Sequence, residues 1–316
     1  MANNKLIYLL MVLVAFFWGG TFNAAGFALA DFHPLTVAFL RFAVATAILF
    51  LIYHRELFST PVKIKDWFNF FLLGLTGIFG YNAFFLYAMQ HTSPVNASLI
   101  VATNPIVTAI IAALLLKEKL TPRLAWGALL SMIGVVLVIS KGSWQVISSL
   151  EFNFGDILTL GSVISWSLYA IVGKTVSDNF SPVVTTFYGF LTGTLILLPF
   201  GVFSRPGLEA IPNASWPAIT AILYLALIGS LLAFIWWNKG VAVLGASRSS
   251  IFINLIPVAT IIISLFMHEP VTPVQIAGCV LVIGAVMLTT DRQPAPAVEP
   301  ERTCGKDKSS KEALPH

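Results

Sequence analysis

Charge is scarce in this sequence. Lys and Arg number 18 and Asp and Glu 14 among 316 residues, so 10% of the chain is charged, while 57% is hydrophobic. The mean hydropathy is +0.87. A soluble domain has about a quarter of its residues charged, and it does not need the apolar runs of about 18 or more residues that recur here. The composition excludes a soluble globular domain and predicts an all-α polytopic membrane protein.

Cysteine and the common catalytic motifs are also scarce. The two cysteines, Cys279 in an apolar run and Cys304 in a polar tail, exclude a disulfide framework and a thiolate zinc site. No phosphate-binding loop and no H-E-x-x-H pair is present, which argues against an ATPase or a zincin protease. The basic residues form no patch, which excludes a nucleic-acid interface. We expect no catalytic residue, cofactor, metal or obligate protein partner; the expected partners are the lipid bilayer and a small molecule.

Apolar runs of about 20 residues predict ten membrane-spanning helices. They lie near residues 6–29, 35–53, 67–88, 95–116, 122–140, 155–176, 182–203, 216–238, 246–267 and 273–290. Several connectors contain only a few residues, so neighbouring helices must be antiparallel. The last segment, 291–316, is rich in charge and proline and is predicted to be a disordered tail.

The distribution of Lys and Arg predicts the orientation in the membrane. With the N-terminus inside, 15 of the 18 basic residues fall on the inner side, and only Lys141 and Arg205 fall outside. Basic residues concentrate on the cytoplasmic side of membrane proteins. We therefore expect a multi-pass protein of the cell inner membrane with both termini in the cytoplasm.

The chain contains an internal repeat of about 150 residues. At offsets of 148 to 152 the matches include Trp18 with Trp166, Pro34 with Pro182, Gly77 with Gly229, Pro105 with Pro257 and Glu118 with Glu269. The repeat predicts one five-helix unit over 1–141, a linker over 142–154 and a second unit over 155–290. Five spans is an odd number, so the second unit should be inverted in the membrane. Inverted repeats are frequent in secondary transporters and also occur in some channels.

Several short stretches resemble one known family. The sequence AFFWGGTF at 15–22 resembles the first helix of EamA-type carriers of the drug/metabolite transporter superfamily. The sequences FLRF at 39–42, EKLTP at 118–122, GDIL at 155–158 and SWSLY at 165–169 resemble other parts of the same family. The resemblance covers 6–290. It implies ten helices, cytoplasmic termini, and export or exchange of small metabolites, but not one particular substrate.

Arg41 is the basic residue that lies well inside a predicted span, seven residues after Pro34. Charged side chains inside a membrane are costly and usually functional. One interpretation is that Arg41 binds a carboxylate or phosphate of the solute. The alternative is a structural role, in which Arg41 pairs with helix carbonyls or with Asp156.

Pro105 and Pro257 interrupt corresponding helices of the two repeats. A proline inside a helix frees a carbonyl and bends the axis, and paired interrupted helices indicate a central binding site. Asn104 and Asn254 lie next to these breaks. Their amides either bind a polar solute or join helices, as Asn often does in bilayers.

Two repeat-related tryptophans, Trp18 and Trp166, lie in the middle of spans rather than at the interface where tryptophan is usual. They are predicted to line a cavity or gate, or to pack against a glycine-rich neighbour. Trp236 and Trp237 are predicted to be cytoplasmic interface anchors. Weaker candidates for solute binding are Asn23, Tyr81, Asn82, Tyr169 and Tyr188.

The segments around the two Thr-Pro pairs predict helix starts. Thr121-Pro122 and Thr272-Pro273 each fit an N-cap followed by a first-turn proline. Glu118 and Glu269 lie beside these turns. They are interpreted as solvated boundary residues, with gating as the alternative.

Acidic residues are missing from the middle third of every predicted span. Proton-coupled carriers usually have a buried carboxylate or histidine there. We therefore expect a neutral, zwitterionic or anionic metabolite, with amino-acid-like solutes favoured, moved by a secondary transporter through alternating access rather than by an enzyme. A channel-like facilitator and, in a different class, a membrane-embedded enzyme are the alternatives.

Overall fold

The computed structural model describes residues 2–88, 91–92, 97, 100–148, 153–266 and 271–290. Within these ranges the side chains of 2–4, 22–23, 260, 263–266 and 290 are not described. The predicted tail, Glu269 and part of the predicted linker lie outside the described residues. All the regular elements of the described residues are helices, and these residues contain no strand, as the sequence predicts.

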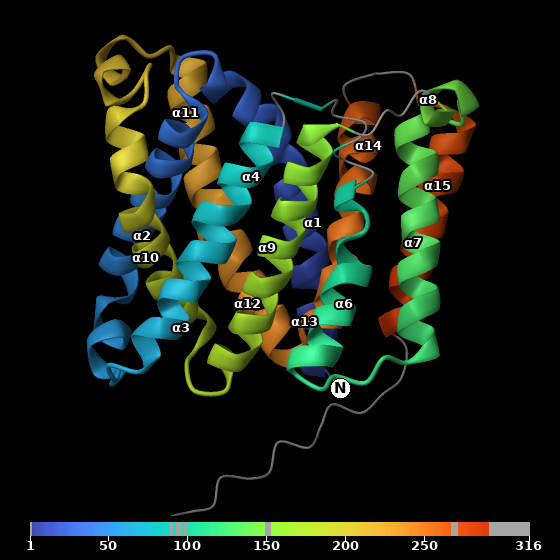
Figure 1. The fold of residues 1–316 in the computed structure, drawn as a ribbon, viewed down its shortest axis with the longest axis horizontal. Helices are drawn as coiled ribbons and strands as arrows, with labels where there is room; N and C mark the ends of the chain where they lie inside the picture. The colour runs from blue at the N-terminus through green and yellow to red at the C-terminus, as the bar shows by residue number, and fades with distance from the viewer. Residues whose placement is uncertain are drawn as a thin grey trace, which may run out of the picture.

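The first half of the chain forms a bundle of helices with one π-helical segment (Figure 1). Its elements are α1 (Ala2–Leu29), α2 (Pro34–Ser59), α3 (Asp66–Leu73), η1 (Gly74–Gly80), α4 (Tyr81–Ala88), α6 (Asn104–Leu115), α7 (Pro122–Ser140) and the short α8 (Trp144–Ser148).

The second half contains the corresponding elements and two 3₁₀ segments. They are α9 (Phe154–Ser177), α10 (Pro182–Phe203), η2 (Leu208–Asn213), α11 (Trp216–Tyr224), η3 (Leu225–Leu232), α12 (Ala233–Leu244), α13 (Ala246–Ser250), η4 (Ile251–Leu255), α14 (Ile256–Phe266) and α15 (Pro273–Thr290).

Seven described helices are long and apolar enough to cross a membrane. They correspond to seven of the ten predicted spans: Lys5–Leu29, Pro34–Ser59, Asp66–Ala88, Pro122–Ser140, Phe154–Ser177, Pro182–Phe203 and Trp216–Leu244. Large apolar side chains face outward, among them Leu51, Phe58 and Leu114, each about 70–77% exposed. Such a surface suits lipid rather than water, and the protein is a multi-pass membrane protein.

Of the three remaining predicted spans, the last is the shorter continuous helix α15, and the other two are interrupted. The span predicted over 95–116 contains a turn at 102–103 before α6, and the span over 246–267 is divided into α13, η4 and α14. Pro105 occupies the first turn of α6, and Pro257 is the second residue of α14. Proline is tolerated at such positions because the first helical N–H groups have no partner in the helix. The prolines therefore begin new helical segments rather than bend existing ones.

Predicted helix starts agree with the structure. The Thr121 side chain accepts a hydrogen bond from the backbone N–H of Leu124, with Pro122 as the first residue of α7. The Thr272 side chain likewise accepts from the backbone N–H of Gln275 at the start of α15. These caps satisfy N–H groups that a helix leaves unpaired at its N-terminus.

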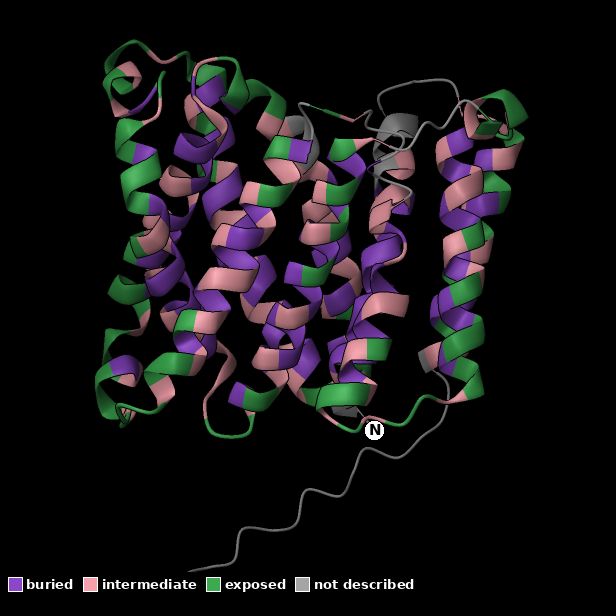
Figure 2. Ribbon diagram, in the orientation of Figure 1, coloured by how far each residue is buried: buried purple, intermediate pink, exposed green. Residues whose placement is uncertain are grey.

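The two halves contact each other through matching elements. α2 packs on α10 and α7 packs on α15; α1 packs on α12 and α14, as α9 packs on α4 and α6. The chain enters α1 and turns from α9 to α10 at the same end of the bundle, so α1 and α9 run in opposite directions (Figure 1). Buried residues follow the facing sides of the central helices (Figure 2).

The two π-helical segments also match between the halves. η1 and η3 interrupt the third long helix of each half, and the repeat-related Gly77 and Gly229 lie within them. π-helical turns are rare in proteins, and those that occur often lie at functional sites. η1 packs against α10, and η3 packs against α2 and α1.

Candidate functional site

A cavity of about 230 Å³ lies between the two halves. Both halves contribute to its wall, from α1, α2, α4 and the turn before α6 on one side and from α9, α12, η4 and α14 on the other. The lining residues are Trp18, Thr21, Arg41, Phe42, Tyr81, Asn82, Phe85, Ala97, Val101, Ala102, Asn104, Val135, Val163, Trp166, Phe234, Ile253, Asn254, Ile256 and Pro257.

Aromatic rings form one wall of the cavity. The ring of Trp18 meets that of Trp166 edge-on at a centroid distance of 5.1 Å, and Phe234 lies 5.9 Å from Trp18 and 5.7 Å from Trp166. Tyr81 extends this wall, 5.3 Å from Trp166. Such edge-on and tilted ring pairs are favourable, and the wall is suited to apolar or aromatic parts of a solute.

Arg41 supplies the positive charge of the cavity. Its Nε donates to Ser230 Oγ at 2.9 Å, and its Nη2 donates to the carbonyl oxygen of Gly229 at 3.4 Å. Both acceptors belong to the π-helical segment η3. Arg41 forms no ion pair with any acid that the structure describes. Of the two predicted structural partners, a helix carbonyl is present and Asp156 is not.

Asp156 instead stabilises the start of α9. Its carboxylate accepts from the backbone N–H of Asn153, while the Asn153 side chain accepts from the backbone N–H of Asp156. Thr92 also donates to Asp156 Oδ1 at 2.5 Å. This reciprocal capping box holds the carboxylate at the helix end.

Three amides line the cavity, and one of them, Asn254, also joins neighbouring elements. Asn254 donates to Ser131 Oγ at 2.9 Å and to the carbonyl of Ala102 at 3.3 Å. The Asn104 side-chain oxygen accepts from Thr108 at 3.1 Å, and Asn82 donates to its own helix. Each of these three amides keeps its other polar atom without a partner among the described residues. Each amide can therefore still bond a solute while its present bond, between elements for Asn254 and within one helix for the other two, is kept.

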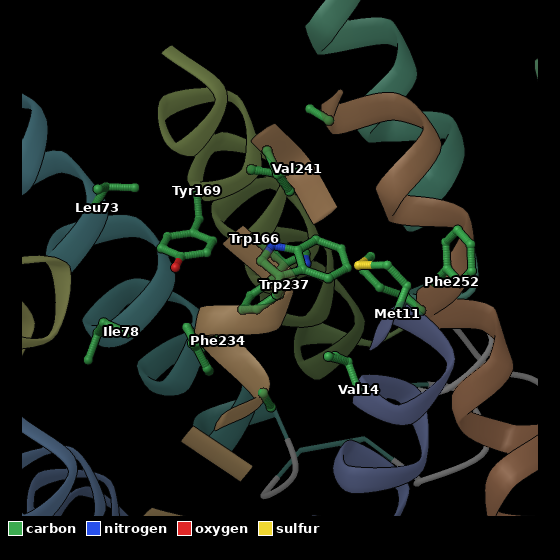
Figure 3. Packing of buried hydrophobic residues seen from close by; sticks show 14 of the residues in the cluster. Met11, Val14, Leu73, Ile78, Trp166, Tyr169, Phe234, Trp237, Val241 and Phe252 are labelled. Atoms are coloured by element: carbon green, nitrogen blue, oxygen red, sulfur yellow. The ribbon is translucent and has the colours of Figure 1, made fainter. Parts of the chain in front are cut away.

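On the N-terminal side of Trp18, packed side chains that include Met11 and Trp237 fill the interior (Figure 3). Met11 and Trp237 are fully buried there. Trp237 contacts both Trp18 and Trp166, at centroid distances of 5.3 and 5.4 Å. The prediction that Trp237 is an interface anchor was therefore wrong, because the ring packs inward against the other indoles.

Polar bonds also join the helices on this closed side. The Tyr169 hydroxyl donates to Asn238 Oδ1 at 3.1 Å, and Asn238 Nδ2 donates to Thr186 Oγ1 at 2.9 Å. These bonds link α9, α12 and α10 within the packed region. Tyr169 therefore belongs to the closure and not to the cavity wall.

Glu118 crosses from one half to the other at the same end. Its carboxylate accepts from the backbone N–H groups of Ala246 and Ser247, at 3.1 and 3.3 Å, and from Ser247 Oγ at 2.5 Å. An acidic group at a helix N-terminus pairs with N–H groups that the helix itself leaves free. Glu118 lies at the boundary, as interpreted from the sequence, but it is half-buried and its carboxylate caps α13 rather than facing only water.

The comparisons with known proteins fit this geometry. The EamA-like transporter family matches residues 5–140 and 153–291, which are the two halves of the bundle. The chain belongs to the EamA-like transporter family. The resemblance found in the sequence is thus confirmed, and the protein is a membrane transporter of that family.

Individual relatives agree with the EamA-like assignment. The uncharacterized transporter YyaM of Bacillus subtilis (strain 168) is 36% identical over 287 residues, covering 89% of this chain and 92% of the relative. The probable terminal-alkyne amino-acid exporter of Streptantibioticus cattleyicolor is 24% identical over 283 residues, covering 89% and 92%. A chain of known crystal structure aligns with a TM-score of 0.71 at 18% identity, covering 91% of this chain and 98% of that one. This last likeness concerns the fold.

Most of the site residues predicted from the sequence of this EamA-like chain lie together. The structure brings to the cavity wall Trp18, Arg41, Tyr81, Asn82, Asn104, Trp166, Asn254 and Pro257. Pro105 is buried in α6 and does not line it. Tyr188 lies elsewhere, stacked on Phe70 at 4.6 Å. The side chain of Asn23 falls outside the described residues.

Sequence reasoning missed Ser230 and several wall residues. Thr21, Phe42 and Phe234 line the cavity. Ser230 does not line it, but its Oγ accepts a hydrogen bond from Arg41 Nε. The available signal was the match of Gly77 with Gly229, because Ser230 is the next residue in the chain after this repeat-related glycine. Nothing in the hydropathy pattern distinguishes Phe42 or Phe234 from other apolar residues in spans.

Proposed function

We propose that this EamA-like protein is a secondary transporter of the cell inner membrane with cytoplasmic termini. It exports or exchanges a small neutral, zwitterionic or anionic metabolite, with amino-acid-like solutes favoured. In this proposal it has ten spans, arranged as two inverted five-helix repeats. The fourth span of each repeat is interrupted. Alternating access exposes the cavity to each side of the membrane in turn.

The observation that carries this proposal is the position of the cavity. It lies between two matched halves, and both interrupted fourth spans contribute to its wall, through Ala102 and Asn104 in one half and Asn254 and Pro257 in the other. Binding at such a place is a recurrent feature of transporters built from inverted repeats. In this proposal the end that the buried Met11 and Trp237 fill is the cytoplasmic end.

The chemistry of the wall supports the proposed solute class. One cation, Arg41, and three amides line the cavity, and none of its lining residues is acidic. A carboxylate suits this wall because it can pair with Arg41. An unpaired charge in an apolar site is costly. An engineered cavity of about 150 Å³ binds benzene, so a cavity of about 230 Å³ suits a solute slightly larger than one ring. The name of the S. cattleyicolor relative, an amino-acid exporter, agrees with this size and charge.

Two other functions are weaker. A channel-like facilitator would need a continuous path, whereas Met11 and Trp237 close the described N-terminal side. A membrane-embedded enzyme would need converging catalytic groups, and among the described residues no three His, Cys, Asp or Glu side chains cluster. The names of the relatives also favour transport.

Two experiments test the proposed function. Comparing metabolites in the medium of cells with and without the protein identifies exported solutes. Counterflow of such a solute in proteoliposomes then separates carrier from channel: we expect saturable uptake driven by unlabelled solute inside. Flux that rises linearly with concentration and shows no counterflow contradicts a carrier.

A further inference from the structure

The environment of Arg41 is built from a part of the chain far away in sequence. Ser230 Oγ and the Gly229 carbonyl are adjacent groups on η3, and both accept from the same guanidinium. Ser230 is fully buried. The Gly229 carbonyl is also held by Trp18, whose Nε1 donates to it at 3.0 Å. The guanidinium therefore rests against a fixed support and not against a flexible surface.

The support uses only one edge of the guanidinium. A guanidinium carries five N–H donors, and Nε and Nη2 together form one edge of the planar fork. Ser230 and Gly229 occupy that edge. Three N–H groups, two on Nη1 and one on Nη2, have no partner in the part of the chain that the structure describes. The end of the fork, where Nη1 and Nη2 each present an N–H, is thus available.

The free end of the fork belongs to the cavity. Arg41 lines the cavity and is half-buried. Its guanidinium carbon lies 4.7 Å from the ring centroid of Phe42, which lines the cavity too. Two parallel N–H groups match the two oxygens of a carboxylate.

We propose that Arg41 is a carboxylate-binding subsite of the cavity and that Ser230 is its positioning residue. Ser230 holds the Nε edge so that the end of the fork meets a monoanionic carboxylate. This inference rests on the proposed function and specifies which part of the solute the site recognises.

The charge of the site favours a monoanion over a phosphate dianion. One cation and no acid are present among the lining residues. A carboxylate is neutralised by Arg41, whereas a dianion keeps one negative charge in an apolar cavity, which is costly. The subsite exists once, because the repeat matches Arg41 with Gly189 and Ser230 with Ile78. Neither counterpart has a side chain that could bind or position a carboxylate.

The test uses benzoate and benzamide, which have the same ring and nearly the same size but differ in charge. The dissociation constant of each is obtained from the concentration dependence of thermal stabilisation of the purified full chain. In the wild type we expect benzoate to bind roughly tenfold or more tightly than benzamide, since hydrogen bonds to charged groups are the stronger ones. In Arg41→Gln the ratio should fall to about one.

The Ser230 variants test positioning. We expect Ser230→Ala to lower the benzoate-to-benzamide ratio roughly two- to tenfold, the value of one hydrogen bond, and Ser230→Thr to keep it. Benzamide affinity should not change, which reports an intact cavity. Ser162→Ala is the matched control, because the buried Ser162 hydroxyl bonds only the Thr159 carbonyl of its own helix; this variant should keep the ratio.

Three results would overturn the inference: equal binding of benzoate and benzamide to the wild type, tighter binding of inorganic phosphate than of benzoate, or a ratio unaffected by Ser230→Ala. Absence of counterflow with the ratio intact contradicts the proposed transport and leaves the subsite standing. Counterflow of a solute by a protein that does not distinguish the two probes contradicts the subsite alone.

Discussion

The indole Nε1 of Trp18 donates a hydrogen bond of 3.0 Å to the carbonyl oxygen of Gly229 in the other half of the protein. The repeat matches these residues with Trp166 and Gly77. The Trp166 indole is buried, and its Nε1 has no hydrogen-bond partner among the described residues. The ring of Tyr169 packs against Gly77 instead. Two residues that are equivalent in the sequence thus have different roles in one conformational state.

The difference between the indoles is directly measurable. The indole bands of an ultraviolet resonance Raman spectrum report whether the N–H is hydrogen-bonded. We expect the spectrum lost in Trp18→Phe to be that of a bonded indole, and the spectrum lost in Trp166→Phe to be that of a free one. The same band position in both difference spectra would contradict this assignment.

Gly77 is expected to be intolerant of a side chain. A Cβ at Gly77 would lie 2.2 Å from the Tyr169 ring, and overpacking a filled interior costs about 1–3 kcal/mol. We expect Gly77→Ala to lower the thermal unfolding midpoint in detergent. Gly26→Ala is the control, since a Cβ there meets nothing within 4 Å and alanine is favoured in helices by up to about 1 kcal/mol. Equal destabilisation by both substitutions would refute the close contact.

Asp31 gives the connector before α2 a pH-dependent contact. The backbone N–H of Ser215 donates to Asp31 Oδ2 at 2.6 Å, and hydrogen bonds from the Ser215 backbone and side chain lower the pKa of Asp31 from its ordinary 3.8. A lowered carboxyl pKa means that the stabilisation is present above the ordinary value and is lost as the pH falls through the folded value. The contact is exposed, so its effect should be small and sensitive to salt.

Asp31→Asn tests this contact, because it removes the titration while it keeps the shape. We expect the wild type to melt above the variant at pH 6, and the difference to vanish as the pH falls below 3.8 and through the lowered pKa of Asp31 in the folded state. A difference that is the same at both pH values would show that the charge of Asp31 plays no part.

Local signals in the sequence were sufficient for much of the fold. Long apolar runs predicted seven helices that are present, and Thr121-Pro122 predicted a capped helix start that the structure contains. Arg41 and Asn254 were predicted as site candidates because polar groups in a membrane need partners. These inferences use only neighbours in the chain or the cost of burial, and both can be read from one sequence.

Contacts between distant segments were not predictable in this way. The π-helical form of η3, the support of Arg41 by Ser230 and the inward position of Trp237 all depend on which helix faces which. The same holds for Glu118, whose three bonds go to residues 128 and 129 positions away. Hydropathy gives the existence of a span but not its rotation, so it cannot distinguish a lipid-facing side chain from one that closes a cavity.

Glu118 offers a test of alternating access, the central claim of the account. The carboxylate stabilises the closed N-terminal end by capping α13. Removing it should therefore favour the state that opens toward that end. Val101, a half-buried residue of the cavity wall, provides a position for a reporter cysteine in a chain whose Cys279 and Cys304 are replaced by Ala.

The decisive measurement is the rate at which a membrane-impermeant maleimide labels Val101→Cys from each side, in right-side-out and in everted vesicles. Alternating access predicts reciprocal changes: in the Glu118→Ala background, labelling from the N-terminal side becomes faster and labelling from the opposite side becomes slower. Glu209→Gln is the control, because Glu209 pairs with Arg205 at the surface and lies in η2, away from α13; this variant should leave both rates unchanged. Rates that rise on both sides, or access from one side in every background, would contradict the account.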